Sequence, residues 1–338
     1  MKLRFLFLVL ILIIGLTFGF RALRSGVPPA PDYPTRVIAT SDSEVVIEIP
    51  AGTTGSEIAK LLFENGVVKS SLSYFRIAVA DPNSEKVAPG AHRLTLEISA
   101  AQALEQLLDH NRIPNLLKVF EGAWTSEIIH SMIVYGFSKK EIDAAFKVLI
   151  LPVGFKTAEG LLFPAQYSFP TGTTAAQVAQ ALINRFRSEK TGQEILSAAG
   201  KYSPLDLLTI ASIIQAEGDI ADFAKVSRVI FNRLEISMPL QMDSTVNYIT
   251  KRRGDIFVNT SSTLIKSPYN TYQRYGLPPT PIGNPGVAAM KAALHPIAGD
   301  WLYFITVAPG DTRFTKSHDQ FLEWKIIYQK NRKAGAFN

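Results

Sequence analysis

The sequence contains no cysteine, so disulfides, thiolate nucleophiles and cysteine-based metal sites are excluded. Histidine is scarce as well: the five histidines never stand four residues apart and form no zinc-like spacing, so we expect no metal and no other cofactor. RNP-type aromatic motifs and long runs of lysine or arginine are also missing. Their absence argues against a nucleic-acid partner.

Charged residues make up only 19% of the 338 residues, whereas 47% are apolar. A chain of this length and composition can bury a sizeable core and should fold as two or three domains. The net charge of +6 suits a partner that is an acidic polymer or an anionic membrane surface.

A single apolar run of 16 residues, from Phe5 to Phe20, lies between Lys2 and Arg4 before it and Arg21 and Arg24 after it. A helix of that length covers roughly 24 Å, which approaches the ~30 Å hydrocarbon core if flanking residues join it and the arginines snorkel. A cleaved signal peptide is the alternative, but no small-x-small cleavage site follows the run. We therefore predict an uncleaved single-pass anchor, followed by a proline-rich linker.

The next segment alternates short strands with short helices. Residues 45–49 alternate as a strand, Thr54 and Glu57 frame a capping box for a helix, a second helix fits 71–79, and 93–96 reads as a return strand. This strand, helix, helix, strand order resembles LysM, a small glycan-binding module of cell-wall proteins. Farther on, 117–120 predicts a strand and 125–135 a helix, and further helices should begin after Ser138 and Thr174.

Glu217 stands where an ordinary helix would carry an apolar residue. Ser203 is the expected N-cap of this helix, its buried stripe runs through Ile210 and Ile214 to Glu217, and Gly218 ends it. Desolvation and the negative end of the helix dipole both raise a carboxyl pKa, and a protonated Glu near neutral pH is what a general acid needs. A lone Glu at a helix end is more often solvated, so the residues downstream decide.

Three dense segments follow, at 238–246, 267–272 and 276–286. The prolines in the last of them stiffen a long irregular stretch, and the tyrosines and amides of the second suit a sugar, which presents one apolar face and a rim of hydroxyls. A proline-rich linker between helices would have a similar composition.

Several ordered motifs in this part of the chain resemble those of MltG/YceG-type endolytic murein transglycosylases. They are Glu217 with its helix, Phe231–Leu234, Leu240–Gln241, Asp243, Thr245–Val246, Ser267–Tyr272, Gly276–Gly286, His295–Pro296 and Leu302–Phe304. The likeness takes in Glu159–Gly160, Phe163–Pro164, Tyr167, the anchor and the LysM-like segment, so it covers nearly the whole chain.

The resemblance implies an enzyme of the cytoplasmic (inner) membrane that cleaves peptidoglycan glycan strands internally outside the cytoplasm, with its N-terminus inside and Glu217 as the catalytic acid. It also implies association with glycan-polymerising penicillin-binding proteins. The expected fold is α+β: an anchor at 1–24, a linker at 25–44, a LysM-like domain at 45–115 and a mostly helical YceG-like catalytic domain at 116–338.

The sequence departs from the family pattern at four positions. Gln215 stands where a second Glu is common, Ala165 replaces the Asp usual after Phe-Pro, and Thr312 and Phe321 replace two histidines. His318 is nearby but out of register. The change at 215 puts a paired carboxylate in doubt and leaves a single-acid mechanism intact.

A lytic transglycosylase, a carbon–oxygen lyase, needs only one carboxyl group. We predict that Glu217 protonates the oxygen between N-acetylmuramic acid and N-acetylglucosamine, and then takes the proton of the muramyl C6 hydroxyl as that oxygen attacks C1 and closes a 1,6-anhydro ring. Because the hydroxyl is tethered to the reacting sugar, no bound water is required. Such cleavage would terminate or release nascent glycan strands.

The substrate contacts are expected from six residues. The candidates are Asn232, Gln241 and Asn270 for N-acetyl groups or hydroxyls, Tyr269 and Tyr272 for stacking, and Asp243, which could instead cap a helix beginning near Thr245.

Two other functions stay open. A muramidase would hydrolyse the same bond and would need a helper carboxylate such as Asp219, Asp222 or Asp243. A non-catalytic, membrane-tethered scaffold would bind peptidoglycan strands without cleaving them.

Overall fold

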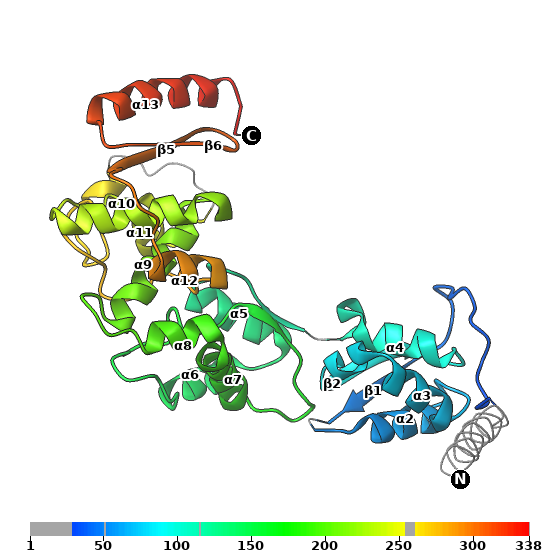
Figure 1. The fold of residues 1–338 in the computed structure, drawn as a ribbon. Coiled ribbons are helices and arrows are strands. Elements are labelled where there is room, and N and C mark those ends of the chain that lie inside the picture. The colour runs from blue at the N-terminus through cyan, green and yellow to red at the C-terminus, as the bar shows by residue number, and fades with distance from the viewer. Residues whose placement is uncertain (1–28, 51, 115, 254–260, 338) are drawn as a thin grey trace, which may run out of the picture. The chain divides into compact units, whose positions relative to one another are not determined.

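The computed structural model describes residues 29–50, 52–114, 116–253 and 261–337 (Figure 1). The fold is mixed α/β, with many helices and three two-stranded antiparallel sheets among these residues. Contacts divide the chain into two units, one formed by 1–115 with 168–171 and the other by 116–167 with 172–338. The apolar run expected to be an anchor lies outside the described residues, and no helix within them is long and apolar enough to cross a bilayer.

The first unit is built on a two-stranded sheet. Its elements are β1 (Glu44–Ile49), α2 (Gly55–Glu64), α3 (Ser71–Ala80), η1 (Pro82–Lys86), β2 (Gly90–Thr95), α4 (Ala100–Leu108) and η2 (His110–Arg112). This confirms the predicted strand, helix, helix, strand order, and the capping box at Thr54 and Glu57 is present. The core packs Ile47 and Leu94 of the sheet against Leu62 and Tyr74 of the helices, all at most 3% exposed.

The second unit is mostly helical. Its helices are α5 (Thr125–Tyr135), α6 (Lys139–Lys147), α7 (Ala175–Ser188), α8 (Lys190–Leu196), α9 (Pro204–Glu217), η3 (Ile220–Asp222), α10 (Phe223–Glu235), α11 (Asp243–Thr250), η4 (Ser262–Leu264), α12 (Val287–Leu294) and α13 (His318–Lys333). Its strands are β3 (Leu117–Val119), β4 (Ala165–Tyr167), β5 (Tyr303–Ala308) and β6 (Asp311–Thr315), paired β3 with β4 and β5 with β6.

Helix α9 is the central helix of this unit. It contacts α8, α10, α11 and α12, and its residues 207–214 are all buried (Figure 1). A helix that is apolar on every side must be enclosed, and only its ends can reach solvent. As predicted, Ser203 caps its start and Glu217 is its last residue.

The proline-rich stretch 276–286 is part of the core, and the linker interpretation is wrong. Asn284 is fully buried, and its side chain accepts a hydrogen bond from Leu162 N (2.8 Å) and donates one to Ala123 O (2.8 Å). The Ile282 N–H donates to the Ser212 hydroxyl of α9 at 3.0 Å. These bonds fix the stretch against the central helix.

Candidate active site

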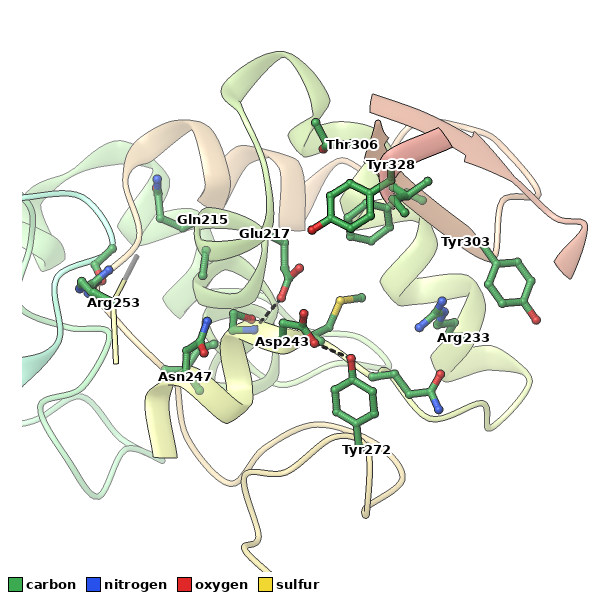
Figure 2. Close-up of a pocket in the computed structure, with 18 of the residues that line it drawn as sticks. Gln215, Glu217, Arg233, Asp243, Asn247, Arg253, Tyr272, Tyr303, Thr306 and Tyr328 are labelled. Atoms are coloured by element: carbon green, nitrogen blue, oxygen red, sulfur yellow. Dashed lines mark hydrogen bonds between the residues drawn. The ribbon is translucent and has the colours of Figure 1, made fainter. Parts of the chain in front are cut away.

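A cleft of about 820 Å³ opens in the second unit where α9 ends (Figure 2). It is lined by the end of α9, the start of α11, residues of β5 and α13, and Glu121, Gly122, Trp124, Arg252 and Arg253. Glu217 lies in the middle of this lining.

The carboxyl group of Glu217 meets the start of α11. The Ser244 N–H donates to Glu217 Oε1 at 3.0 Å, which is the dashed line that starts at Glu217 in Figure 2. Burial raises the pKa of Glu217, hydrogen bonding from Ser244 lowers it, the Asp243 carboxylate raises it and the Arg233 charge lowers it. The net direction is upward, as predicted from the sequence. The surroundings therefore favour the protonated carboxyl, which is the form that donates a proton.

Asp243 is bonded to Tyr272 across the cleft floor. The Tyr272 hydroxyl donates to Asp243 Oδ1 at 2.5 Å, and both residues line the cleft. Burial raises the pKa of Asp243, while the Tyr272 bond and the charge of Lys325 oppose the rise. The alternative of Asp243 as a helix cap is wrong, because it is the first residue of α11 and Met242 occupies the N-cap position.

Arg233 is a buried cation beside the cleft that the sequence interpretation left without a role. Its Nε donates to Leu302 O at 2.6 Å and another guanidinium N–H donates to Leu240 O. Its charge centre lies 5.4 Å from the ring centroid of Tyr303. It thus ties α10 to β5 and to the segment that enters α11. Its place on the buried face of the amphipathic α10 was the available signal.

The predicted substrate contacts divide into two groups. Gln241, Asp243 and Tyr272 line the cleft together with Glu217. Asn232, Tyr269 and Asn270 are not among its lining residues, and each bonds within the fold. Their partners are Trp301 O for Asn232 Nδ2 (2.9 Å), the Thr280 hydroxyl for Tyr269 (2.8 Å) and Ile265 O for Asn270 Nδ2 (2.8 Å).

The positions that depart from the family pattern have definite places. Gln215 lines the cleft, and its Oε1 accepts the Gly286 N–H at 2.9 Å. Phe321 lines the cleft with His318, whose ring lies 5.4 Å from that of Tyr303. The Thr312 hydroxyl of β6 lies 3.0 Å from that of Thr306, a residue of β5 that lines the cleft. Ala165 lies in β4 and is not a lining residue.

Several further lining residues escaped the sequence interpretation, among them Asn247 and Arg253. Asn247 follows Asp243 by one helical turn and shares its face of α11, a spacing that could have found it. Arg253 pairs with Glu127 through contacts of 2.5 and 2.7 Å and stacks over Trp124 at 4.3 Å. Within the described residues, no three His, Asp or Glu side chains gather as a metal site would require.

Comparison with known proteins gives consistent matches. The YceG-like family model matches residues 47–325. An endolytic murein transglycosylase of Bacillus subtilis is 32% identical over 318 residues, covering 87% of this chain and 88% of that protein. One of Streptococcus pneumoniae is 27% identical over 340 residues, covering 89% of this chain and 60% of its own length. A crystal structure of a YceG-like protein from Listeria monocytogenes has a TM-score of 0.53 and 25% identity, covering 83% of this chain and 98% of that one.

Proposed function

The chain belongs to the YceG-like family, and we propose that it is an endolytic lytic transglycosylase of peptidoglycan. It would cleave the bond between N-acetylmuramic acid and N-acetylglucosamine within a glycan strand and leave 1,6-anhydro-muramyl ends. The names of the relatives from Bacillus subtilis and Streptococcus pneumoniae support this activity.

The observation that carries the proposal is the position of Glu217. It is the last residue of a buried helix, it faces an open cleft, and burial raises its pKa. The protonated carboxyl donates to the glycosidic oxygen, and the bond from that oxygen to C1 breaks. The C6 hydroxyl oxygen then bonds to C1, and the Glu217 carboxylate accepts the proton of that hydroxyl. The acid is thereby restored within one turnover.

The three carboxylates considered as helpers of a muramidase give hydrolysis little support. Of the three helpers considered for a muramidase, Asp219 and Asp222 are absent from the cleft lining. Asp243 is present, but it accepts the Tyr272 hydroxyl and burial raises its pKa. A water-activating base must be ionised and free to accept a proton. Burial opposes the ionised form of Asp243, and the Tyr272 hydroxyl already occupies its Oδ1, so Asp243 is a poor candidate for that role.

Substrate contacts follow from the lining. Gln241 is exposed at the cleft and Tyr272 supplies an aromatic face, so we propose both as contacts for the sugar. The amide of Asn247 faces the same space (Figure 2) and suits an N-acetyl group or hydroxyl. We do not retain Asn232 or Asn270 as contacts, because their amide groups are used within the fold. Tyr269 is not retained because it lies outside the cleft lining and its ring packs on that of Tyr248.

The proposal extends to location and domain roles. Residues 1–24 would form a single membrane anchor with the N-terminus inside, and residues 116–338 the catalytic domain outside the cytoplasm. The helix pair on a two-stranded sheet in the first unit supports a LysM-like glycan-binding role for residues 45–115. Glycan-polymerising penicillin-binding proteins are proposed partners, since they make the strands that this enzyme would cut.

Product analysis of purified protein tests the proposal. The wild type and Glu217→Gln are incubated with glycan strands, and new ends are identified by mass spectrometry. Glu235→Gln is the matched control, because Glu235 also ends a helix but is exposed and outside the cleft lining. We expect anhydro ends from the wild type and the control and none from Glu217→Gln. Reducing ends would select a muramidase, and strand binding without new ends would select a scaffold.

A further inference from the structure

Helix α11 begins without a capping side chain of its own. Its N-cap position is held by Met242, which has no side-chain oxygen and forms no capping bond. By contrast, α7 and α9 are capped by Thr174 and Ser203. The first N–H groups of a helix have no partner within the helix, so a helix without a cap needs an acceptor from elsewhere.

The carboxyl group of Glu217 is that acceptor. Ser244 is the second residue of α11, and its N–H donates to Glu217 Oε1 at 3.0 Å. The side chain that ends α9 therefore caps the start of α11. The next N–H, that of Thr245, returns to Met242 O at 3.1 Å, so Ser244 makes the capping contact.

The Ser244 hydroxyl is a second donor at the same place. Ser244 lines the cleft, and its buried Oγ makes no hydrogen bond of normal geometry among the described residues. Its side chain nonetheless acts to lower the pKa of Glu217. A buried hydroxyl without a partner is unfavourable, and few are found in folded proteins. Rotation of its proton could add a donor for the charged carboxylate.

We propose that Ser244 is a positioning residue of this reaction, whose N–H and hydroxyl orient the Glu217 carboxyl and stabilise its ionised form. The inference rests on the proposed transglycosylase function. The two half-reactions need different forms of Glu217. Burial at the end of α9 stabilises the protonated form, which donates, and the start of α11 stabilises the carboxylate, which must accept the C6 proton. A group that both gives and takes a proton works best with a pKa near the operating pH.

Two substitutions separate the two donors. Ser244→Ala deletes the hydroxyl and keeps the N–H, whereas Ser244→Pro deletes both. Proline is tolerated in the first turn of a helix, where no N–H bonds within the helix. Ala176→Pro is the matched control, because Ala176 is the second residue of α7 and lies outside the cleft lining. Ser244→Thr keeps both donors and tests rescue.

The readout is the pH profile of anhydro-end formation under saturating glycan. Losing donors raises the pKa of Glu217, so the alkaline limb should move up by about one pH unit in Ser244→Pro and by less in Ser244→Ala. A weaker acid is a slower one, so kcat near neutral pH should fall about three- to tenfold with KM changed less than about twofold. Ala176→Pro and Ser244→Thr should keep the wild-type profile.

The possible results test the role of Ser244 separately from the proposed transglycosylase function. A wild type that forms no anhydro ends overturns the proposed function. An active wild type whose alkaline limb stays in place in both Ser244→Ala and Ser244→Pro overturns the role of Ser244 alone. If thermal melting shows that Ser244→Pro is unfolded, the shift in Ser244→Ala decides.

Discussion

Glu159 should be a main support of the second unit, and its replacement by alanine should be costly. Its side chain is only 7% exposed and accepts hydrogen bonds from Thr125 N (3.0 Å), Tyr248 OH (2.9 Å) and Asn284 Nδ2 (3.3 Å). Each buried donor left without a partner costs roughly 1–3 kcal/mol. With one long bond and some access for water, we expect Glu159→Ala to lower the free energy of unfolding by about 3–5 kcal/mol.

Glu159→Gln is the matched control, because it keeps the volume and one acceptor oxygen for the Thr125 and Asn284 donors. It should lower the free energy of unfolding by about 1 kcal/mol. It should also remove a pH dependence. Burial raises the pKa of Glu159 above its ordinary value of 4.5, so the folded state binds the proton more tightly. The stability that this tighter proton binding adds is present below pH 4.5, and it is lost as the pH rises through the pKa of Glu159 in the folded state.

Urea unfolding followed by tryptophan fluorescence measures this, since Trp124, Trp301 and Trp324 all belong to the second unit. If the dependence of the unfolding free energy on urea concentration keeps its slope, a loss of unfolding free energy appears as a lower urea midpoint. A midpoint for Glu159→Ala equal to that of the wild type would refute the reasoning. Equal losses in the alanine and glutamine variants would show that the three hydrogen bonds carry little of the effect.

Three further predictions follow from single contacts. The first unit should lose stability as the pH falls below about 6.5, because burial lowers the pKa of His92 in the folded state and the unfolded chain then binds the proton more readily. Hydrogen exchange over residues 44–95 should show this loss of stability. The substitution His92→Gln should abolish it. Gln215→Glu should move the alkaline limb of activity upward by raising the pKa of Glu217 with a second carboxylate in the cleft; an unchanged pH profile would contradict it. Arg233→Lys should lower the free energy of unfolding by about 2–3 kcal/mol, since one ammonium cannot reproduce the guanidinium fork to two carbonyls; an unchanged urea midpoint would count against it.

Helix starts were predictable because capping is local. The caps at Thr54, Ser138, Thr174 and Ser203 each form as the sequence indicates. The cap and its partner are three residues apart, so no knowledge of the fold is needed. The start of α11 was predicted two residues late because its cap is not local. Its cap comes from Glu217, on another helix.

Residue type alone could not assign the substrate contacts. Asn232 and Asn270 have the amides that a sugar needs, but the same amides satisfy backbone carbonyls at Trp301 and Ile265. Which carbonyls lack a backbone donor depends on how distant segments meet, and buried ones must be satisfied. Gln241, by contrast, reaches the cleft with its side chain exposed.

The position of Glu217 explains how the chain can do without a second Glu at 215. Helix α9 is enclosed along its length, so its end is where a carboxyl can combine burial with access to the cleft. Gln215 supplies the acceptor for the Gly286 N–H, so the wall of the cleft keeps its hydrogen bond without a charge. A carboxylate there would hold Glu217 protonated more strongly and weaken it as the base that we propose for the second half-reaction. With Gln215, the base form is opposed chiefly by burial and is supported by the start of α11.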